Sequence, residues 1–340
     1  MTTEAQPNLR DNIEEPIDPA LPICDPHHHF WKSGVQPPGD PHYNRYMLEE
    51  LQDDTGSGHN IVSTVYVECR SGYRTTGRKI LRPVGETEFV RKLVTAGGKA
   101  KTAVAAGIVG AADLTLGVGV DLVLEKHIAA GEGVFRGIRM SAVWDPHPEI
   151  PAYTSPPKGL LLDARFREGF ARLKKYNLVF DAWLYFHQMR ELADLAKTFP
   201  NIPIVLNHVG GPILVGPYAV KQDEVWAEWR KGITALAACP NVVIKLGGLG
   251  MTRCGFGWDT RKTPIGSVEL AAETAPYYLF CIDRFGTKRS MFESNFPVDK
   301  VSYSYSVLWN SFKRIAAGFS AAERADLFHD TATRVYRLKA

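Results

Sequence analysis

The sequence contains few cysteines and none of the spacings that would make them a scaffold. Only five occur in 340 residues, they are widely scattered, and no two form a Cys-x-x-Cys pair. An odd, dispersed set argues against a disulfide framework and against a structural zinc site of the zinc-finger kind. The pattern is typical of a protein from a reducing compartment. The five are Cys24, Cys69, Cys239, Cys254 and Cys281.

The chain also lacks a long apolar run and an excess of one charge. No segment approaches the roughly 20 apolar residues that span a bilayer, and residues 1–22 are acidic and proline-rich, without the apolar core of a secretory signal. Lys and Arg number 40 against 37 Asp and Glu, a formal net charge of +3. A nucleic-acid or membrane-surface binder would show a basic excess. We therefore expect a cytoplasmic protein that acts on a small molecule, and homo-oligomerisation stays open.

Eight short apolar runs alternate with longer amphipathic stretches. The runs cover residues 21–24, 61–69, 102–109, 134–140, 178–184, 202–206, 242–246 and 290–292. Helical patterns fall on residues 163–176, 187–199, 225–238, 268–285, 305–317 and 320–338. Strands that alternate with helices predict βα units and a parallel sheet. Eight such units fit a single α/β domain, a (β/α)8 TIM barrel over residues 23–340, preceded by an N-terminal arm over residues 1–22.

A doubly wound open sheet is the alternative fold. It would carry a Gly-x-Gly-x-x-Gly turn after the first strand, and the sequence has none there. Three strand-to-helix connections are long, at about residues 70–86, 141–162 and 250–267. In a TIM barrel such loops lie on the C-terminal face, where active sites are built. We expect these loops to shape a pocket or a lid.

The segment Asp25–Trp31, with sequence DPHHHFW, follows the first apolar run. Side chains alternate along a strand, so Asp25, His27 and His29 should share one face. Two imidazoles at the C-terminal end of a barrel strand can hold one metal ion, and zinc accepts such ligands while leaving a position for water. A surface histidine cluster is the weaker interpretation, because the group lies between an apolar run and Phe30-Trp31.

Two further strand ends carry polar candidates. His208 closes the sixth run before a Gly-Gly-Pro turn, and it either reaches the same centre or is a buried structural histidine. Glu293 and Asn295 follow the eighth run and share parity, so both should face the barrel axis. A carboxylate at this position can bind a metal or act as a base on water, and the alternative for Glu293 is a supporting contact to Arg or His.

Strands two and four end in a carboxylate and a guanidinium. Glu68 is a candidate equivalent to Glu293, and an inward Arg139 could bind a substrate carboxylate or carbonyl oxygen in a fork, or only pair with Glu68 or Asp25. His187 follows strand five, where it contacts substrate or merely opens the next helix. Aromatic residues near the strand ends could line an apolar pocket, although most aromatics are core. Those predicted as substrate contacts are Trp144, Trp183 and Tyr185.

With these residues in view, the sequence resembles the amidohydrolase-2 family of the amidohydrolase superfamily, and within it the lactonase-type TIM-barrel hydrolases. The family pattern reads Asp-x-His-x-His-Phe-Trp, Gly-Ile-Arg, Val-Leu-Asp-His-Leu-Gly, Lys-Leu-Ser-Gly and Met-Phe-Gly-Ser-Asp-Trp-Pro. It is matched here by Asp25–Trp31, Gly137–Arg139, Val205–Gly210, Lys245–Gly248 and Met291–Pro297. Together these motifs are specific for the family, and the resemblance covers nearly the whole chain after the arm.

The last motif departs from the family. The usual Asp, which serves as general base or metal ligand, is Asn295 here, and an amide cannot take a proton at neutral pH. Glu293 stands where the family has a small residue. The resemblance therefore implies that Glu293 or Glu68 supplies the missing carboxylate while Asn295 positions water. Asn207 also stands where Asp is common, but strand alternation points it away from the pocket.

The resemblance implies a hydrolase that opens a lactone or related cyclic ester. His27, His29 and His208 would hold one divalent metal, with zinc as the expected ion, and Arg139 would bind an oxyanion or a substrate carboxylate. A metal-free mechanism stays open because of Asn295. The alternatives are a metal-dependent non-oxidative decarboxylase of an aromatic or unsaturated carboxylic acid, and a catalytically impaired barrel that only binds a ligand.

Overall fold

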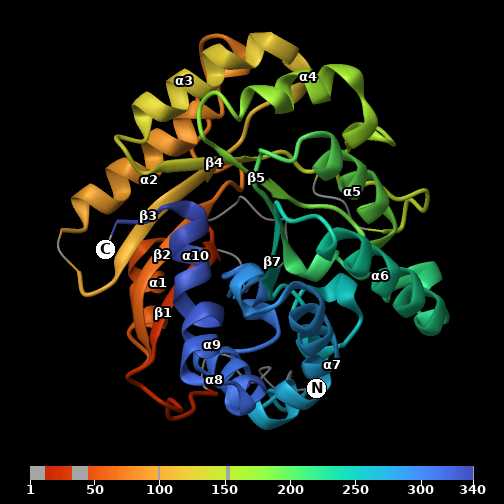
Figure 1. The fold of residues 1–340 in the computed structure, drawn as a ribbon. Helices are drawn as coiled ribbons and strands as arrows, with labels where there is room; N and C mark the ends of the chain where they lie inside the picture. The colour runs from red at the N-terminus through yellow and green to blue at the C-terminus, as the bar shows by residue number, and fades with distance from the viewer. Residues whose placement is uncertain (1–11, 33–44, 99, 151–153, 340) are drawn as a thin grey trace, which may run out of the picture.

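The computed structural model describes residues 12–32, 45–98, 100–150 and 154–339, and in them eight parallel strands form one sheet in the order of the chain (Figure 1). The first and last strands meet just beyond their ends, where the Asn295 amide donates to His27 O at 2.9 Å and the His29 amide to Phe296 O at 2.8 Å. The predicted (β/α)8 barrel is confirmed. The strands are β1 (Pro22–His28), β2 (Asn60–Val67), β3 (Ala103–Gly110), β4 (Phe135–Arg139), β5 (Val179–Ala182), β6 (Ile204–Leu206), β7 (Val242–Leu246) and β8 (Ser290–Phe292).

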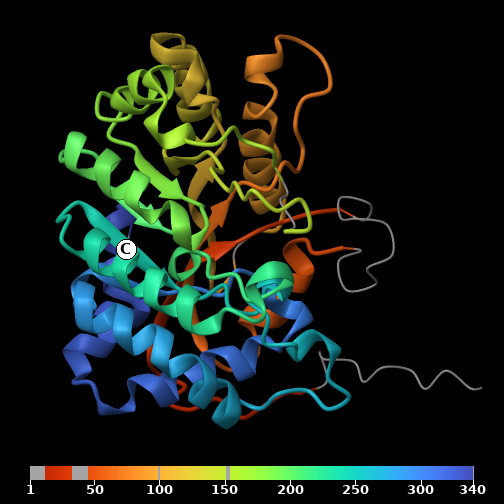
Figure 2. The same cartoon turned by 90° about the vertical axis from the view of Figure 1, so that its right-hand side faces the viewer.

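Helices enclose the strands on the outside, as the side view shows (Figure 2). They are α1 (Leu48–Thr55), α2 (Val84–Ala96), α3 (Asp121–Ala130), α4 (Ala164–Arg172), α5 (Met189–Thr198), α6 (Gln222–Ala237), α7 (Ser267–Phe285), α8 (Tyr305–Ile315), α9 (Ala321–Ala325) and α10 (Thr331–Tyr336). Side-chain caps begin two of them: Asp163 accepts from the Phe166 amide at 2.8 Å, and Ser320 and Glu323 form a capping box. The helices α1 to α3 fall outside the helical patterns that the sequence predicts.

The apolar residues form two cores. The larger one lies between the strands and the outer helices. The smaller one lies inside the barrel, where alternate strand residues such as Val65, Val179, Val205 and Val243 pack together with Tyr336 of α10. The sequence predicts one helix over residues 320–338, but a π-helical turn at Asp326–Asp330 separates α9 from α10. In Figure 1, α10 lies across the ring of strands instead of joining the outer layer.

The three long connections predicted from the sequence all contribute to one cavity. The β2–α2 loop supplies Glu68, Cys69 and Arg70, the β4–α4 loop supplies Ser141 and Thr154, and the β7–α7 loop supplies Met251 and Arg253. These loops begin at the C-terminal ends of their strands, so the cavity lies at the barrel mouth.

Three other expectations concern the rest of the chain. All five cysteines are free and buried. Within the described residues, no helix has the length and apolarity that crossing a bilayer requires. Residues 1–11 of the predicted arm lie outside the described residues. The rest of the arm follows the barrel surface, where the Ile17 amide donates to Asn310 Oδ1 of α8 at 2.8 Å.

Candidate active site

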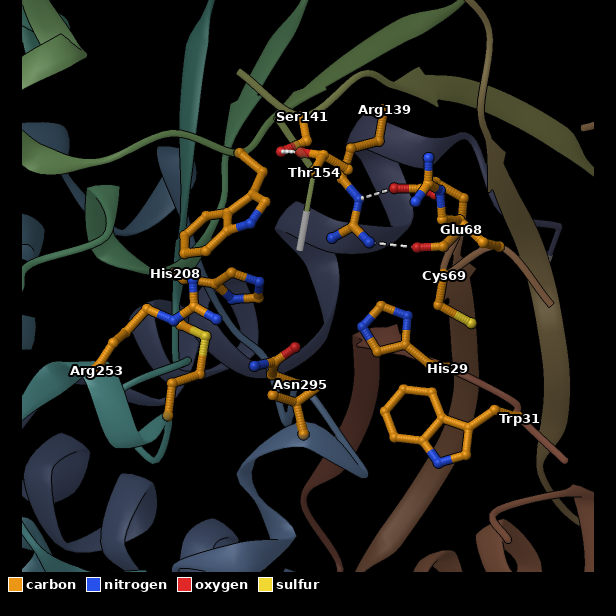
Figure 3. Close-up of a pocket in the computed structure, with 14 residues that line it drawn as sticks. His29, Trp31, Glu68, Cys69, Arg139, Ser141, Thr154, His208, Arg253 and Asn295 are labelled. Carbon is orange, nitrogen blue, oxygen red and sulfur yellow. Dashed lines mark hydrogen bonds and ion pairs between the residues drawn. The ribbon is translucent and has the colours of Figure 1, made fainter. Parts of the chain in front are cut away.

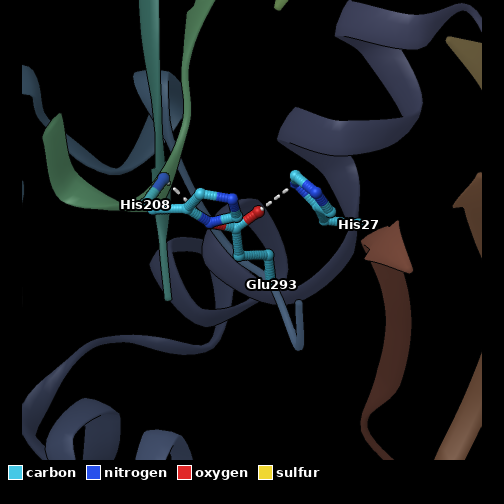
Figure 4. Close-up of side chains that lie close together, drawn as sticks. All are labelled: His27, His208 and Glu293. Atoms are coloured by element: carbon cyan, nitrogen blue, oxygen red, sulfur yellow. Dashed lines mark hydrogen bonds and ion pairs between the residues drawn. The ribbon is translucent and has the colours of Figure 1, made fainter. Parts of the chain in front are cut away.

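A buried carboxylate joins two imidazoles at the floor of the barrel mouth (Figure 4). Glu293 Oε1 accepts from His208 Nδ1 at 2.7 Å and from the His208 amide at 3.0 Å, and Glu293 Oε2 lies 2.7 Å from His27 Nδ1. The side chains of Glu293 and His27 are fully buried, and that of His208 is 3% exposed. The ends of β1, β6 and β8 thus bring three of the predicted residues together.

The backbone around His208 explains how this residue reaches the floor. β6 ends at Leu206, and His208 and Val209 then adopt left-handed conformations with φ of 53° and 46°. Such conformations cost about 1–3 kcal/mol each and cluster at functional sites. Asn207 keeps the alternation of β6: it faces the barrel interior like Val205 two residues earlier, and it donates to Asp181 Oδ2 at 3.0 Å. Asn207 does not line the cavity, as the sequence predicts, and His208 is the residue that departs from alternation at this strand end.

The glycines of the KLGG segment leave room for this floor. A Cβ at Gly248 would lie 2.5 Å from His208 Cβ, and one at Gly247 would lie 2.4 Å from the Glu293 carbonyl oxygen. Non-bonded contacts of a Cβ atom are essentially never this short in proteins. The contact with Glu293 is also a contact with backbone, which cannot move aside as a flexible side chain could. The glycine pair is therefore required for His208 and Glu293 to pack against β7.

Two cations surround His27. Arg139 Nη1 lies 3.3 Å from His27 Nε2, and Lys245 Nζ lies 3.2 Å from His27 Nδ1. Arg139 also donates from Nε to Glu68 Oε1 at 2.8 Å and from Nη2 to the Glu68 carbonyl oxygen. Lys245 pairs with Asp181 Oδ2 at 2.7 Å, and both side chains are fully buried. The two alternatives given for Arg139 are thus not exclusive, because it pairs with Glu68 and still lines the cavity.

The sequence reasoning missed Asp181 and Lys245. Both stand inside strongly apolar runs, LVFDAWL and VVIKL, where a charged residue is out of place. Charged side chains are almost never fully buried unless they are paired. A single charge within each of two strands of the same barrel was therefore a usable signal for an interior ion pair.

Three side chains of the floor could together bind one metal ion. His27, His208 and Glu293 each offer one ligand atom, and these atoms all lie within 4.8 Å of one another. Glu293 Oε2 is fully buried and makes no hydrogen bond among the described residues, although it lies 2.7 Å from His27 Nδ1. A buried carboxylate oxygen that lies beside an imidazole nitrogen and has no hydrogen-bond partner suits a cation. Two imidazoles and a carboxylate are also a ligand set that zinc accepts.

His29 lies near this group but is not part of it. Its Nδ1 is 2.8 Å from Val67 O, which fixes the ring, and its ring centroid is 4.9 Å from that of His27. His29 lines the cavity above, where it stacks on Trp31 with an interplanar angle of 16° (Figure 3). Its predicted role as a metal ligand stays a prediction.

The cavity above the floor has a volume of about 150 Å³. Polar groups and aromatic rings share its wall: Figure 3 shows Arg253 and His208 on one side, Glu68 and Trp31 on the other, and Asn295 between them. The lining residues are His29, Trp31, Glu68, Cys69, Arg70, Arg139, Ser141, Thr154, Trp183, His208, Met251, Arg253, Asn295 and Val298.

Three of the residues predicted as substrate contacts lie elsewhere. Tyr185 accepts a hydrogen bond from Arg253 Nη1 at 2.8 Å, and His187 Nε2 lies 3.0 Å from Trp144 O. These three residues, Tyr185, His187 and Trp144, do not line the cavity, whereas Trp183 does. Tyr185 supports the cavity wall through Arg253, and direct contact of these three with substrate stays a prediction.

Asn295 has a fixed orientation. Its Nδ2 donates to Asp299 Oδ1 at 2.7 Å, while Asp299 Oδ2 accepts from the Gly250 amide at 2.9 Å and from the Tyr303 hydroxyl at 2.7 Å. Because its NH2 group donates to Asp299, the Asn295 amide turns its oxygen away from that carboxyl group. Asn295 lines the cavity and thus presents an acceptor there, as the family's Asp would.

Burial sets the electrostatics of the floor. Removal from water raises the pKa of Glu293 to about 8, although the Lys245 ammonium acts in the opposite direction. Burial also holds the pKa values of His27 and His208 well below that of a free imidazole, and the Lys245 and Arg139 cations act in the same direction. Both rings are therefore neutral at neutral pH, the form in which histidine binds metals.

Asp299 makes the stability of the protein depend on pH. Burial raises its pKa from 3.8 to about 7. A raised folded-state pKa means that the contribution is fully present below the unfolded value and is lost as pH rises through about 7. We expect the free energy of unfolding of the wild type to fall by about 3 kcal/mol more between pH 5 and pH 8 than that of Asp299→Asn.

Urea titrations of both proteins at the two pH values measure this difference. Other buried carboxyl groups contribute equally to both proteins, so they cancel in the comparison. Asn at this position still accepts from Gly250 and Tyr303 through its oxygen. Identical pH dependence in the two proteins would show that the Asp299 carboxyl is not perturbed.

The family model described as amidohydrolase matches residues 24–338. The uncharacterised protein y4mH of Sinorhizobium fredii is 34% identical over 333 residues, which cover 94% of this chain and 99% of that protein. The chain belongs to the amidohydrolase-2 family.

Two further relatives of this amidohydrolase are a named lactonase and a solved amidohydrolase structure. The L-fucono-1,5-lactonase of Burkholderia multivorans is 32% identical over 177 residues, 52% of this chain and 57% of that protein. The crystal structure of an amidohydrolase from Burkholderia multivorans with bound zinc is similar with a TM-score of 0.69 and 26% identity, covering 93% of this chain and 99% of that one. The resemblance to lactonase-type TIM-barrel hydrolases is confirmed, and this chain is an amidohydrolase-superfamily enzyme.

Proposed function

We propose that this amidohydrolase opens a lactone or a related cyclic ester by hydrolysis. The observation that carries the proposal is the buried Glu293 carboxylate joined to His27 and His208, directly below a cavity with polar and aromatic walls. The lactonase named among its relatives supports the same reaction class. The cavity volume of about 150 Å³ is close to that of an engineered cavity known to hold benzene, so a single ring is the expected substrate size.

His27, His208 and Glu293 are the proposed holders of one divalent metal, with zinc as the expected ion because its ligands are nitrogen and carboxylate oxygen. A bound zinc ion in a related amidohydrolase supports this choice. When bound, the metal supplies Lewis acidity toward the ester carbonyl and the attacking water. His29 lines the cavity beside these donors and is retained as a candidate ligand.

Glu68 is the proposed proton acceptor. It lines the cavity, whereas Glu293 is fully buried beneath it, so Glu68 is the carboxylate that a cavity water can reach. The Arg139 guanidinium holds Glu68 in place by donating to the Glu68 carboxylate and to the Glu68 carbonyl oxygen. The Asn295 oxygen, turned to the cavity by Asp299, accepts a hydrogen bond from the water and orients it.

The proposed reaction is the addition of water to the ester carbonyl followed by cleavage of the ring ester bond. The water oxygen bonds to the lactone carbonyl carbon, and Glu68 takes one water proton. The Arg139 guanidinium faces the negative charge that develops on the carbonyl oxygen. The ring C–O bond breaks, the proton passes to the departing ring oxygen, and the product is a hydroxy carboxylic acid.

A panel of five- and six-membered lactones, with acid release followed by a pH indicator, tests the proposal. We expect turnover of at least one ring, and we expect removal of metal by a chelator to lower kcat at least tenfold, with recovery on addition of zinc. In parallel, aromatic carboxylic acids are assayed for CO2 release. Release of CO2 without lactone opening would favour the decarboxylase alternative, and the absence of any turnover would leave the ligand-binding barrel.

A further inference from the structure

Inside the barrel, a chain of polar contacts leads from the C-terminal helix to the floor of the site. The Tyr336 hydroxyl of α10 donates to both Asp181 oxygens at 2.9 Å. Asp181 Oδ2 pairs with Lys245 Nζ at 2.7 Å, and Lys245 Nζ lies 3.2 Å from His27 Nδ1. Lys245 also lies over the Tyr336 ring, 5.3 Å from its centroid. All four side chains are fully buried.

This ion pair is not explained by stability. Burying two charges costs more than their attraction returns in many proteins, and replacement of such a pair by apolar residues is often neutral or stabilising. The barrel interior is otherwise packed with valines, for which an apolar pair would be the natural complement. The pair instead touches a residue of the site, His27, and each of its charges has a further polar partner.

The contact of Lys245 with His27 affects which nitrogen of the imidazole ring can accept a hydrogen bond. Lys245 and Arg139 face opposite nitrogens of the ring, and both groups only donate hydrogen bonds. A neutral imidazole accepts at one nitrogen only, so these two cations compete for its lone pair. The position of the Lys245 ammonium therefore helps decide how the ring is turned and which nitrogen is available at the floor.

We propose that Tyr336, Asp181 and Lys245 act as positioning residues for His27. Tyr336 orients the Asp181 carboxylate, Asp181 holds the Lys245 ammonium, and Lys245 fixes the His27 ring beside Glu293. The role of this triad in turnover rests on the proposed function, whereas its effect on the His27 ring does not.

The Tyr336→Phe variant is the main test, because it removes one hydroxyl and keeps the ring that packs on Lys245. Asp181 keeps its contacts with Lys245 and Asn207, so the fold should persist. We expect kcat for lactone opening to fall about tenfold with KM within about twofold of wild type, as for loss of supporting contacts around a ligand residue. We also expect the imidazole nitrogen resonances of His27 to shift in 15N-histidine NMR spectra at fixed pH, with assignment from His27→Asn.

A matched control exists elsewhere in the chain. The Tyr46 hydroxyl donates to Asp54 Oδ2 at 2.7 Å, and Asp54 Oδ1 accepts from Lys300 Nζ at 2.6 Å, which is the same trio of residue types away from the floor. We expect Tyr46→Phe to leave the His27 resonances and kcat unchanged. Lys245→Met provides a second, stronger perturbation, with a larger shift of the His27 resonances if the variant folds.

Each result bears on the proposal. A shift of the His27 resonances in Tyr336→Phe together with the fall in kcat supports it. Unchanged His27 resonances, an equal shift in Tyr46→Phe, or a shift without a fall in kcat overturns it. If the wild type opens no lactone, the proposed function fails, and the resonances alone then decide whether the triad controls the ring.

Discussion

Replacement of Glu293 with glutamine is expected to lower kcat/KM for lactone opening by at least about 1,000-fold, because an uncharged amide cannot hold a cation between two imidazoles. Glutamine has nearly the same shape, and its oxygen can still accept from His208 Nδ1 and the His208 amide. Its NH2 group would instead face His27 Nδ1. We expect bound zinc, measured by mass spectrometry of the purified protein, to fall from about one ion per chain to a small fraction.

Glu86→Gln is the matched control for this prediction. Glu86 is also buried with a pKa raised by burial to about 8, and one of its oxygens accepts from Tyr66, Cys69 and Ser71. Glu86 is not part of the floor, so we expect this substitution to leave metal content intact and to change kcat/KM by less than about threefold. Normal metal content and normal turnover in Glu293→Gln would contradict the proposed metal site.

Replacement of Glu68 with glutamine is expected to lower kcat by about 100- to 10,000-fold, the range found for the loss of one acid–base group. The variant should keep its zinc, because Glu68 lies on the cavity wall and not in the His27–His208–Glu293 group. Kinetics and metal analysis of the same preparation therefore separate the two carboxylates. A variant that loses both metal and activity has lost a metal ligand. A variant that loses activity but keeps its metal has lost the proton acceptor.

The control for Glu68 must also break an Arg–carboxylate pair. Glu269 accepts from Arg261 Nη1 at 2.9 Å and from Nη2 at 3.2 Å on the surface of the molecule. Exposed pairs of this kind contribute about 0–1 kcal/mol, so Glu269→Gln should behave as wild type. Retention of full activity by Glu68→Gln would transfer the proton-accepting role to another group.

The fold and the floor of the site were predictable because they depend on local patterns. Eight apolar runs separated by amphipathic stretches are enough to indicate a barrel, and polar residues placed directly after three of those runs converge once the barrel closes. The His27, His208 and Glu293 group therefore follows from position along the chain. Helices α1 to α3 escaped prediction: α1, for example, is short and acidic, with the sequence LEELQDDT, so it offers little apolar periodicity.

The remaining parts of the site could not be predicted because they depend on contacts between distant segments. Tyr336 meets Asp181 across 155 positions of sequence, and no periodicity announces that a terminal helix will enter the barrel. The orientation of Asn295 depends on Asp299, four positions later, whose carboxylate could have faced solvent. Alternation also does not explain how His208 reaches the floor, because the left-handed backbone at His208 and Val209 changes direction where β6 ends.

The position of α10 across the ring of strands has a practical consequence for anyone who shortens or tags this protein. A truncation before Thr331 would remove α10, whose side chains cover the interior core. Solvent would then reach the Asp181–Lys245 pair from the end of the barrel opposite the mouth. Activity lost in such a shortened protein would then be mistaken for damage at the mouth. An affinity tag is better placed ahead of residue 12 than close behind Tyr336.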